Sequence, residues 1–329
     1  MKRLVLGIDG GGTRTRAAIA DENGTFCGAG EAGPSNYDDV GQEHAQANIQ
    51  RAVQQARRHA GLEPHPEASP FAAAFLGMAG VVSEKDRQVI RDIAQRLHLA
   101  PDAHVGVDHD IRITLAGGLS GRPGIALILG TGSSCYGRNT AGQSWQSGGW
   151  GHLISDEGSS YWLGLQAMRC AIGAYDGRLG PTLLLEQVKA YLGLMDMPEI
   201  MHRIYVVGLS RMEVAALAPR VIEAAQQGDA QALGLIRRGT QEVSECVLAV
   251  AGRLGFTSGR CELALAGGLL NAGEIVLNPL GEAVIDKIPH CQIRLAELSP
   301  VLGACLLALD SLGIPSEGAI VEQLQQTRR

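Results

Sequence analysis

Two glycine-rich segments, each following a short apolar stretch, carry residue types suited to binding phosphate. In the first, apolar residues 4–8 lead into Asp9, Gly10–Gly12 and Thr13. Consecutive glycines leave backbone N–H groups open to an anion, and the threonine hydroxyl adds a donor. Asp9 offers the carboxylate oxygens that hold a hydrated Mg²⁺. The segment therefore predicts a phosphate site beside a metal, or else an ordinary glycine-rich hairpin turn.

The second segment repeats this pattern. Residues 124–129, GIALIL, are followed by Gly130, Thr131, Gly132 and Ser133. In both places the chain continues as a strand-like run and then a polar turn, which indicates a diverged internal duplication. Neither segment has the Gly-Lys-Ser/Thr sequence of P-loop enzymes or a dinucleotide fingerprint. Two such loops facing each other could hold one polyphosphate from both sides.

The elements that must position these loops alternate between strands and helices, which predicts a largely parallel sheet with helices on its faces. The elements predicted for the first half are a helix over 40–59, a proline-rich linker over 64–70, a strand over 71–78, a helix begun by the N-cap Ser83 and a strand over 104–107. Those predicted for the second half are helices over 157–175, 182–194, 211–227, 229–254 and 299–312, and strands over 261–266 and 292–296.

Composition narrows the class of protein. A chain of 329 residues with 45% hydrophobic residues can build two cores. A net charge of −6 argues against nucleic-acid and membrane-surface partners, and no apolar stretch approaches the ~20 residues of a membrane helix. The start of the chain does not read as a signal peptide. Seven scattered cysteines without a C-x-x-C pair predict reduced thiols in a cytoplasmic protein.

A third segment is more specific. Residues 148–159 read GGWGHLISDEGS. With the two loops, this resembles the N-acetylglucosamine kinase family and its glucosamine kinase relatives, in the BadF/BadG/BcrA/BcrD-type ATPase group of the sugar kinase, actin and heat-shock ATPase superfamily. The resemblance covers nearly the whole chain. It implies an α/β fold of two ribonuclease H-like (actin-like ATPase) domains with an interdomain cleft.

The resemblance also implies how the chain is divided and what it does. Residues 1–116 with the C-terminal helix 299–329 would form a phosphate-1 and sugar domain, and residues 117–298 a phosphate-2 and adenosine domain. The implied reaction is ATP-dependent phosphorylation of the primary hydroxyl of an amino sugar, N-acetylglucosamine or glucosamine. ATP and Mg²⁺ are the implied cofactors, with Asp9 holding the metal through water, and a homodimer is the implied assembly.

Nucleotide contacts follow from the same resemblance. The implied residues are Asp9, Gly10, Gly11, Gly12, Thr13, Gly130, Thr131, Gly132, Ala215, Gly267, Gly268 and Asn271. The last three lie at a strand-to-helix turn and resemble an adenosine motif. Glycine at that turn has an alternative explanation in close packing of the helix on the strand.

Asp108 matches the family's catalytic base. It ends a predicted strand, and ligands of open α/β sheets bind beyond the carboxyl ends of strands. Phosphoryl transfer needs one carboxylate to align the attacking hydroxyl. Asp108 could instead cap a helix or be a surface carboxylate. The sequence VDHDIR departs from that of the animal kinases, which leaves Asp110 as an alternative base.

A sugar requires carboxylate or amide partners for its hydroxyls and a flat apolar surface for its ring. The residues implied to contact the sugar are Asn36, Asp108, Ser133, Ser134, Gly149, Trp150, Gly151, Asp156 and Glu157. Some have alternative explanations: Asn36 is also a turn former, and Asp156 and Glu157 could cap the following helix. His152 is interpreted as a hydrogen-bonded structural histidine, with a ligand contact as the alternative.

Two other classes of protein remain open. One is an ATPase activator of the 2-hydroxyacyl-CoA dehydratase type, which holds an iron–sulfur cluster on cysteines; the cysteine spacing here does not suggest one. The other is a non-catalytic sugar sensor, which would bind sugar without turning over ATP. The sequence does not distinguish a free from an acetylated amino sugar.

Overall fold

The computed structural model describes residues 2–62, 71–315 and 318–326, so the linker predicted over 64–70 lies outside the described residues. The chain divides into two compact units, residues 1–124 with 295–329 (unit 1) and residues 125–294 (unit 2). The sequence places the boundaries at 116/117 and 298/299. Residues 117–118 belong to unit 1 because they end a helix packed on the C-terminal one: a Cβ on Gly303 would lie 2.4 Å from the Gly117 nitrogen.

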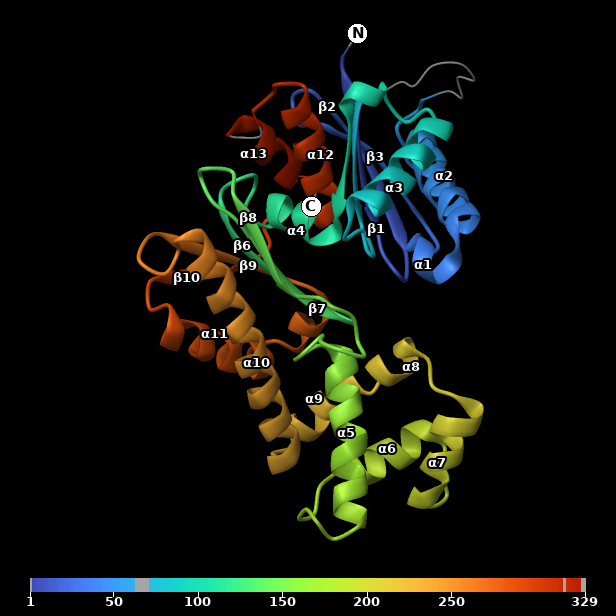
Figure 1. Ribbon diagram of the computed structural model, residues 1–329, viewed down its shortest axis with the longest axis vertical. Coiled ribbons are helices and arrows are strands. Elements are labelled where there is room, and N and C mark those ends of the chain that lie inside the picture. Colours follow the sequence, from blue (N-terminus) through green and yellow to red (C-terminus); the bar gives the residue numbers. More distant parts are fainter. Residues whose placement is uncertain (1, 63–70, 316–317, 327–329) are drawn as a thin grey trace. The chain divides into compact units, whose positions relative to one another are not determined.

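Unit 1 is built on a mixed five-stranded sheet in the order β3-β2-β1-β4-β5. Figure 1 labels three of these strands, β1, β2 and β3. Its strands are β1 (Leu4–Gly10), β2 (Thr15–Asp21), β3 (Phe26–Ala32), β4 (Phe71–Met78) and β5 (Val105–His109). β1, β2 and β3 form an antiparallel meander, while β4 runs parallel to β1 and β5 parallel to β4. The carboxyl ends of β1, β4 and β5 therefore meet at one edge of the sheet.

Helices cover both faces of this sheet. They are α1 (Tyr37–Val40), α2 (Gln42–His59), α3 (Glu84–Arg96), α4 (Asp110–Gly118), α12 (Pro300–Ser311) and α13 (Ala319–Gln325), with a short 3₁₀ turn over Asp102–His104. α2 lies so close to β3 that a Cβ on Gly30 would be 2.1 Å from the Ala52 oxygen. On the other face, a Cβ on Gly7 would be 2.4 Å from the Val301 oxygen of α12. α12 thus contributes to the core of unit 1 on this face of the sheet.

Unit 2 has a second five-stranded sheet, in the order β10-β9-β6-β7-β8. Its strands are β6 (Gly124–Leu129), β7 (Ser133–Arg138), β8 (Ser144–Gly148), β9 (Cys261–Ala266) and β10 (Cys291–Leu295). The order repeats that of unit 1 when β6, β7 and β8 stand for β1, β2 and β3, and β9 and β10 for β4 and β5. The predicted duplication and the predicted α/β class are therefore confirmed.

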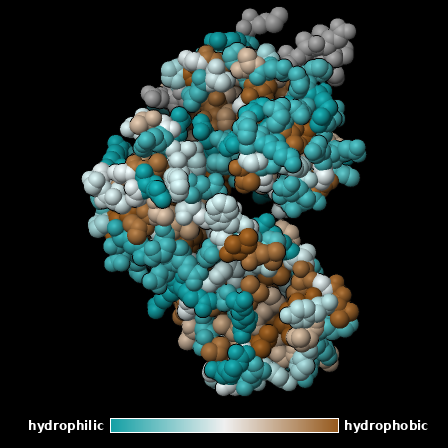
Figure 2. Space-filling view, viewed as in Figure 1, coloured by the Kyte–Doolittle hydropathy of each residue, from teal (hydrophilic) through white to brown (hydrophobic). Residues whose placement is uncertain are grey.

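The helices of unit 2 enclose a largely aliphatic core. They are α5 (Ser160–Tyr175), α6 (Leu184–Leu192), α7 (Ile200–His202), α8 (Arg211–Ala215), α9 (Ala218–Gln226), α10 (Ala230–Leu254) and α11 (Glu274–Lys287), with 3₁₀ turns over Met197–Glu199 and Gly268–Ala272 and a π-helical turn over Arg203–Val207. Apolar side chains gather on the surface over α6 to α8 (Figure 2). They include Met201, Tyr205, Val206 and Val207, which are 60–75% exposed.

Some predicted helix boundaries were wrong for local reasons. The helix predicted over 40–59 is divided because Gly41, at φ +79°, ends α1 and precedes α2. The helix predicted from 157 begins at Ser160, since the Ser159 hydroxyl accepts the Trp162 N–H as its N-cap. Asp156 and Glu157 thus precede the helix and do not cap it. Within the described parts of the chain, no helix is both long and apolar enough to span a membrane.

Candidate active site

In unit 1, two carboxylates lie in one row across the sheet. Asp9 of β1 is opposite Gly77 of β4, and Gly77 is opposite Asp108 of β5. Residues in register on neighbouring strands share a face, so the two carboxylates are on the same face, two strand spacings or roughly 10 Å apart. The gap between them is left by Gly77, where a Cβ would lie 2.5 Å from the Ile113 side chain of α4.

Asp9 is a carboxylate under electrostatic strain. Burial, and next the negative charge of Asp110, raise the pKa of Asp9 from 3.8 to about 6, while Arg16 and Arg14 act in the opposite direction. A nearby divalent cation would relieve this repulsion. Among the described residues, no three His, Cys, Asp or Glu side chains are grouped to hold a metal. The donor set therefore fits Mg²⁺ that keeps its waters and phosphate ligands and uses a single protein carboxylate.

The Gly10–Thr13 loop is fastened by backbone hydrogen bonds on both sides. The Gly10 carbonyl accepts the Ala79 N–H at 2.7 Å, and the Gly11 carbonyl accepts the Ser35 N–H at 3.0 Å. A Cβ on Gly10 would lie 2.4 Å from the end of the Met78 side chain and 2.6 Å from the Ser35 hydroxyl, so a larger residue would require both to move. At Gly12 the nearest atom to such a Cβ is a carboxylate oxygen of Asp39, at 3.5 Å.

Asp108 lies between positively charged side chains. Its carboxylate accepts a hydrogen bond from Arg87 at 2.9 Å and lies 3.6 Å from a guanidinium nitrogen of Arg112. It also accepts the His109 N–H at 2.9 Å, and His109 rather than Asp108 occupies the N-cap position of α4. The helix-cap interpretation of Asp108 was therefore wrong. The two guanidinium groups hold the Asp108 carboxylate in place at the end of β5.

Asn36 has the geometry of a turn former. It is the N-cap of α1, where its side-chain oxygen faces the Asp38 N–H at 3.4 Å and its amide donates to Asp39 at 2.8 Å. A Cβ on Gly80 would lie 2.4 Å from the same oxygen. The amide is thus held in place within unit 1, and its contact with a sugar stays a prediction.

In unit 2, the Gly130–Ser133 loop is fastened to the start of α5. The Gly130 and Thr131 carbonyls accept the N–H groups of Ser160 at 2.9 Å and Tyr161 at 3.2 Å. The Ser133 hydroxyl donates to the Glu157 carbonyl at 2.7 Å. The loop conformation is therefore set by the segment over 156–161 that follows the GGWGH motif.

Asp156 points into this loop. Its side chain is buried, its φ is +63°, and it accepts the Ser133 N–H at 3.3 Å and a hydrogen bond from Arg211 at 2.9 Å. Burial raises the pKa of Asp156, and the Arg211 charge opposes that shift. Glu157 accepts a hydrogen bond from the Ser155 hydroxyl at 2.9 Å. Both carboxylates remain predicted sugar contacts.

The GGWGH motif forms an exposed surface. Trp150 is 74% exposed, and Leu153 and Ile154 are also exposed. Ser134 and Gly149, both predicted sugar contacts, lie together, since a Cβ on Gly149 would be 2.6 Å from the Ser134 hydroxyl. Gly151 borders open space.

His152 packs against a neighbouring ring. Its imidazole meets the Tyr161 ring edge-on, with ring centroids 4.9 Å apart. This contact agrees with the structural interpretation of His152.

The predicted adenosine motif follows β9, which is parallel to β6 with Ala266 opposite Ile128. Gly267 has φ +113°, and a Cβ there would lie 2.2 Å from the Leu129 oxygen, so packing requires glycine. Gly268 borders open space. Asn271 is exposed, whereas Ala215 is buried in α8.

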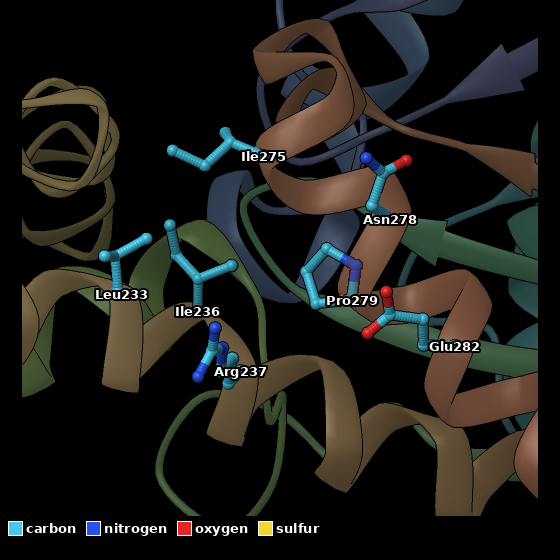
Figure 3. A pocket seen from close by; sticks show the side chains of 7 residues that line it. All are labelled: Leu233, Ile236, Arg237, Ile275, Asn278, Pro279 and Glu282. Atoms are coloured by element: carbon cyan, nitrogen blue, oxygen red, sulfur yellow. The ribbon is translucent and has the colours of Figure 1, made fainter. Parts of the chain in front are cut away.

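A small pocket lies between α10 and α11 (Figure 3). Its lining comes from α10 on one side and α11 on the other: Leu233, Ile236, Arg237, Ile275, Asn278, Pro279 and Glu282. The volume of about 190 Å³ is below the ~300–1,000 Å³ of typical small-molecule clefts.

The sequence did not predict the arginines that pair with Asp108 in unit 1 and with Asp156 in unit 2. Arg112 could have been found, because its i,i+4 spacing from Asp108 places the two side chains together at the start of a helix. Arg87 and Arg211 lie 21 and 55 residues from their carboxylate partners, and nothing local in the sequence pairs them.

Comparisons with known proteins identify an ATPase family and relatives that are named sugar kinases. The chain matches the BadF/BadG/BcrA/BcrD ATPase family over residues 6–308. It is 30% identical over 306 residues to an N-acetylmuramic acid/N-acetylglucosamine kinase of Clostridium acetobutylicum, covering 93% of this chain and 98% of that protein. It is 27% identical over 245 residues to a glucosamine kinase of Vibrio cholerae, covering 74% of this chain and 79% of that protein.

Solved structures agree. A candidate N-acetylglucosamine kinase from Chromobacterium violaceum aligns with a TM-score of 0.75 at 28% identity, covering 93% of this chain and 99% of that chain. A ROK family glucokinase from Streptomyces griseus, solved with glucose and AMPPNP, aligns with a TM-score of 0.58 at 20% identity over 94% and 98% of the chains and supports the fold alone. The chain therefore belongs to the BadF/BadG/BcrA/BcrD ATPase family and has the α/β fold of its sugar kinase relatives.

Proposed function

We propose that the protein transfers the γ-phosphate of ATP to the primary hydroxyl of an amino sugar, N-acetylglucosamine or glucosamine. Relatives that match most of the chain carry these kinase names. The structural observation that carries the proposal is the row of Asp9, Gly77 and Asp108, which places two carboxylates with different surroundings on one face at the carboxyl edge of the sheet.

Asp108 is the proposed base. Arg87 and Arg112 lie 2.9 and 3.6 Å from its carboxylate and orient it. The carboxylate would align the attacking hydroxyl and accept its proton as the new bond to phosphorus forms. Phosphoryl transfer requires little covalent chemistry from the protein. Alignment of the hydroxyl and neutralisation of the phosphate charge therefore supply most of the catalysis.

The two glycine loops are the proposed phosphate sites. Backbone N–H groups of Gly10–Thr13 and Gly130–Ser133 would bind the phosphate oxygens. Asp9 would hold Mg²⁺ through water, and that ion would neutralise phosphate charge. The open backbone at Gly268, with Asn271, would accept the adenosine.

Sugar contacts are assigned to both units. Asn36 and Asp108 of unit 1, and Trp150 and Glu157 of unit 2, supply amide, carboxylate and aromatic groups of the kinds that sugars bind.

The test is coupled ADP release from MgATP with glucosamine, N-acetylglucosamine, N-acetylmannosamine, glucose or no sugar. Strong stimulation by one amino sugar is the expected result and names the substrate. Sugar-independent hydrolysis would instead favour an ATPase activator. Sugar binding without turnover would favour a sensor.

We also propose a cytoplasmic homodimer. Seven cysteines, all present as free thiols, suit a reducing compartment. Light scattering coupled to size-exclusion chromatography measures the assembly, and a monomer mass would overturn the dimer.

A further inference from the structure

We propose that Arg211 binds the phosphate chain of the nucleotide at the Gly130–Ser133 loop. The inference rests on the proposed function only in taking a nucleoside polyphosphate as the ligand.

The position of the guanidinium is the first argument. A Cβ added to Gly132 would lie 2.5 Å from Nη2 of Arg211. The charged group therefore rests directly against the backbone of the loop whose N–H groups are the proposed phosphate donors. Glycine at 132 leaves the room that this approach requires.

The charge balance of the loop is the second argument. The loop has no lysine of the kind that P-loop enzymes place on their phosphates. The carboxylate of Glu213, two residues along α8, accepts hydrogen bonds from Arg203 at 2.7 Å and from the hydroxyl of Ser210, the N-cap of α8. In the described part of the chain, the ion-pair partner of Arg211 is Asp156.

The number of free donors is the third argument. A guanidinium has five N–H donors in a planar fork that matches phosphate oxygens. The structure assigns one nitrogen, Nη2, to Asp156, and the side chain is 39% exposed. Buried Asp156 thus orients the guanidinium through Nη2. The other N–H groups of the guanidinium are available to a ligand.

A purely structural role makes a different prediction. If Arg211 only held Asp156 and the loop in place, a variant that keeps a donor to Asp156 would bind MgATP almost as tightly as the wild type. If Arg211 contacts phosphate, its removal should weaken the binding of each ligand according to the number of phosphates that the ligand carries. Arg211→Gln separates the two roles, because it keeps a side-chain amide able to donate to Asp156 but removes the charge.

The experiment measures the dissociation constants of MgATP, MgADP and adenosine by competition with a fluorescent ADP analogue, without sugar. Arg211→Ala and Arg211→Gln are expected to raise the dissociation constants of MgATP and MgADP by about 10- to 100-fold, as the loss of a charged hydrogen bond would. The dissociation constant of adenosine should rise by less than ~3-fold. Arg211→Lys should recover part of the loss. The matched control is Arg220→Ala, which removes an exposed arginine paired with Glu223 on α9 and should change nothing.

Equal weakening of adenosine and MgATP, or unchanged MgATP binding in Arg211→Gln, would overturn the proposal. Should Arg211→Ala fail to fold, Arg211→Gln and Arg211→Lys decide the matter. Because sugar is absent from the assay, the result stands whether or not the protein proves to phosphorylate an amino sugar.

Discussion

At the scale of single residues, the assignment of Asp108 can be tested directly. Asp108→Asn keeps the shape of the side chain but removes its ability to accept a proton. We expect kcat to fall by about 10²–10⁴-fold with sugar and ATP binding largely kept. Steady-state kinetics and sugar titration measure both effects. Asp110→Asn is the matched control, and loss of activity in that variant alone would transfer the role of base to Asp110.

Asp9 predicts a pH-dependent stability. Its folded-state pKa, about 6, exceeds 3.8, so the folded chain binds this proton more tightly than the unfolded chain. The stabilising contribution is present below pH ~4 and lost as pH rises through ~6. At pH 8 the ionised Asp9 carboxylate should lower the free energy of unfolding by about 1–3 kcal/mol. Asp9→Asn should therefore stabilise the ligand-free protein.

Urea unfolding of the wild type and Asp9→Asn at pH 8 and pH 4.5 measures this difference. The stabilisation by Asn should shrink at the lower pH, and an equal difference at both pH values would contradict the assigned cause. The same variant should lose kinase activity, because Asn gives the metal no charge.

The residue types of the site could be predicted from the sequence, but most of their partners could not. Asp108 is recognisable as the last residue of an apolar run, and Arg112 by its helical spacing. The pairing of Asp156 with Arg211 depends on how a loop and a helix 55 residues apart pack together. No local pattern encodes such a contact.

At the scale of elements, the turn after β9 offers a matched pair of glycines. Gly267→Ala should lower the free energy of unfolding by at least ~1–3 kcal/mol, because φ is +113° and the added methyl would meet the Leu129 backbone. Gly268→Ala, which borders open space, should leave stability within ~0.5 kcal/mol but raise the KM for ATP. Urea unfolding and kinetics measure both variants; a stable Gly267→Ala would contradict the packing argument.

The exposed GGWGH segment predicts a spectroscopic signal. Trp150 is 74% exposed, so a sugar that covers it should shift its fluorescence. Trp150→Phe should abolish most of this change and raise the sugar KM, while the KM for ATP stays near that of the wild type. Trp145→Phe is the control, since the Trp145 ring stacks with Arg253, whose Cζ lies 4.6 Å from the ring centroid. A sugar-induced change that survives in Trp150→Phe would argue against a stacking role.

Elements with one dominant signal were predicted well, and those with competing signals were not. The strands over 71–78 and 261–266 have the predicted bounds because each is a continuous apolar run between turn residues. The start of α5 was missed because three polar residues, Asp156, Glu157 and Ser159, compete for the cap. The helix predicted over 211–227 is divided at Ala216–Leu217, and Pro219 lies in the first turn of α9.

At the scale of the whole molecule, the duplication explains how the chemistry is distributed. Both sheets have the same strand order, and each strand equivalent to β1 leads into a glycine loop. The copies have diverged: unit 1 has Asp9 and Asp108 on one face of its sheet, whereas the loop of unit 2 adjoins Asp156 and Arg211. The repeated loops and the carboxylates could be predicted from the sequence, whereas Arg211 required the structure.

Because Asp108 is proposed to align a hydroxyl of the sugar, turnover of ATP should depend on the sugar. Without sugar, Asp108 has no hydroxyl to align, and water is a poorly positioned substitute. We expect ADP release without sugar to be at least ~10²-fold slower than with the preferred amino sugar. A 6-deoxy analogue, which lacks the accepting hydroxyl, should compete with the sugar and not stimulate ADP release. Should the analogue stimulate hydrolysis as strongly as the true sugar, the hydroxyl would not be the nucleophile, and alignment by Asp108 would no longer explain the catalysis.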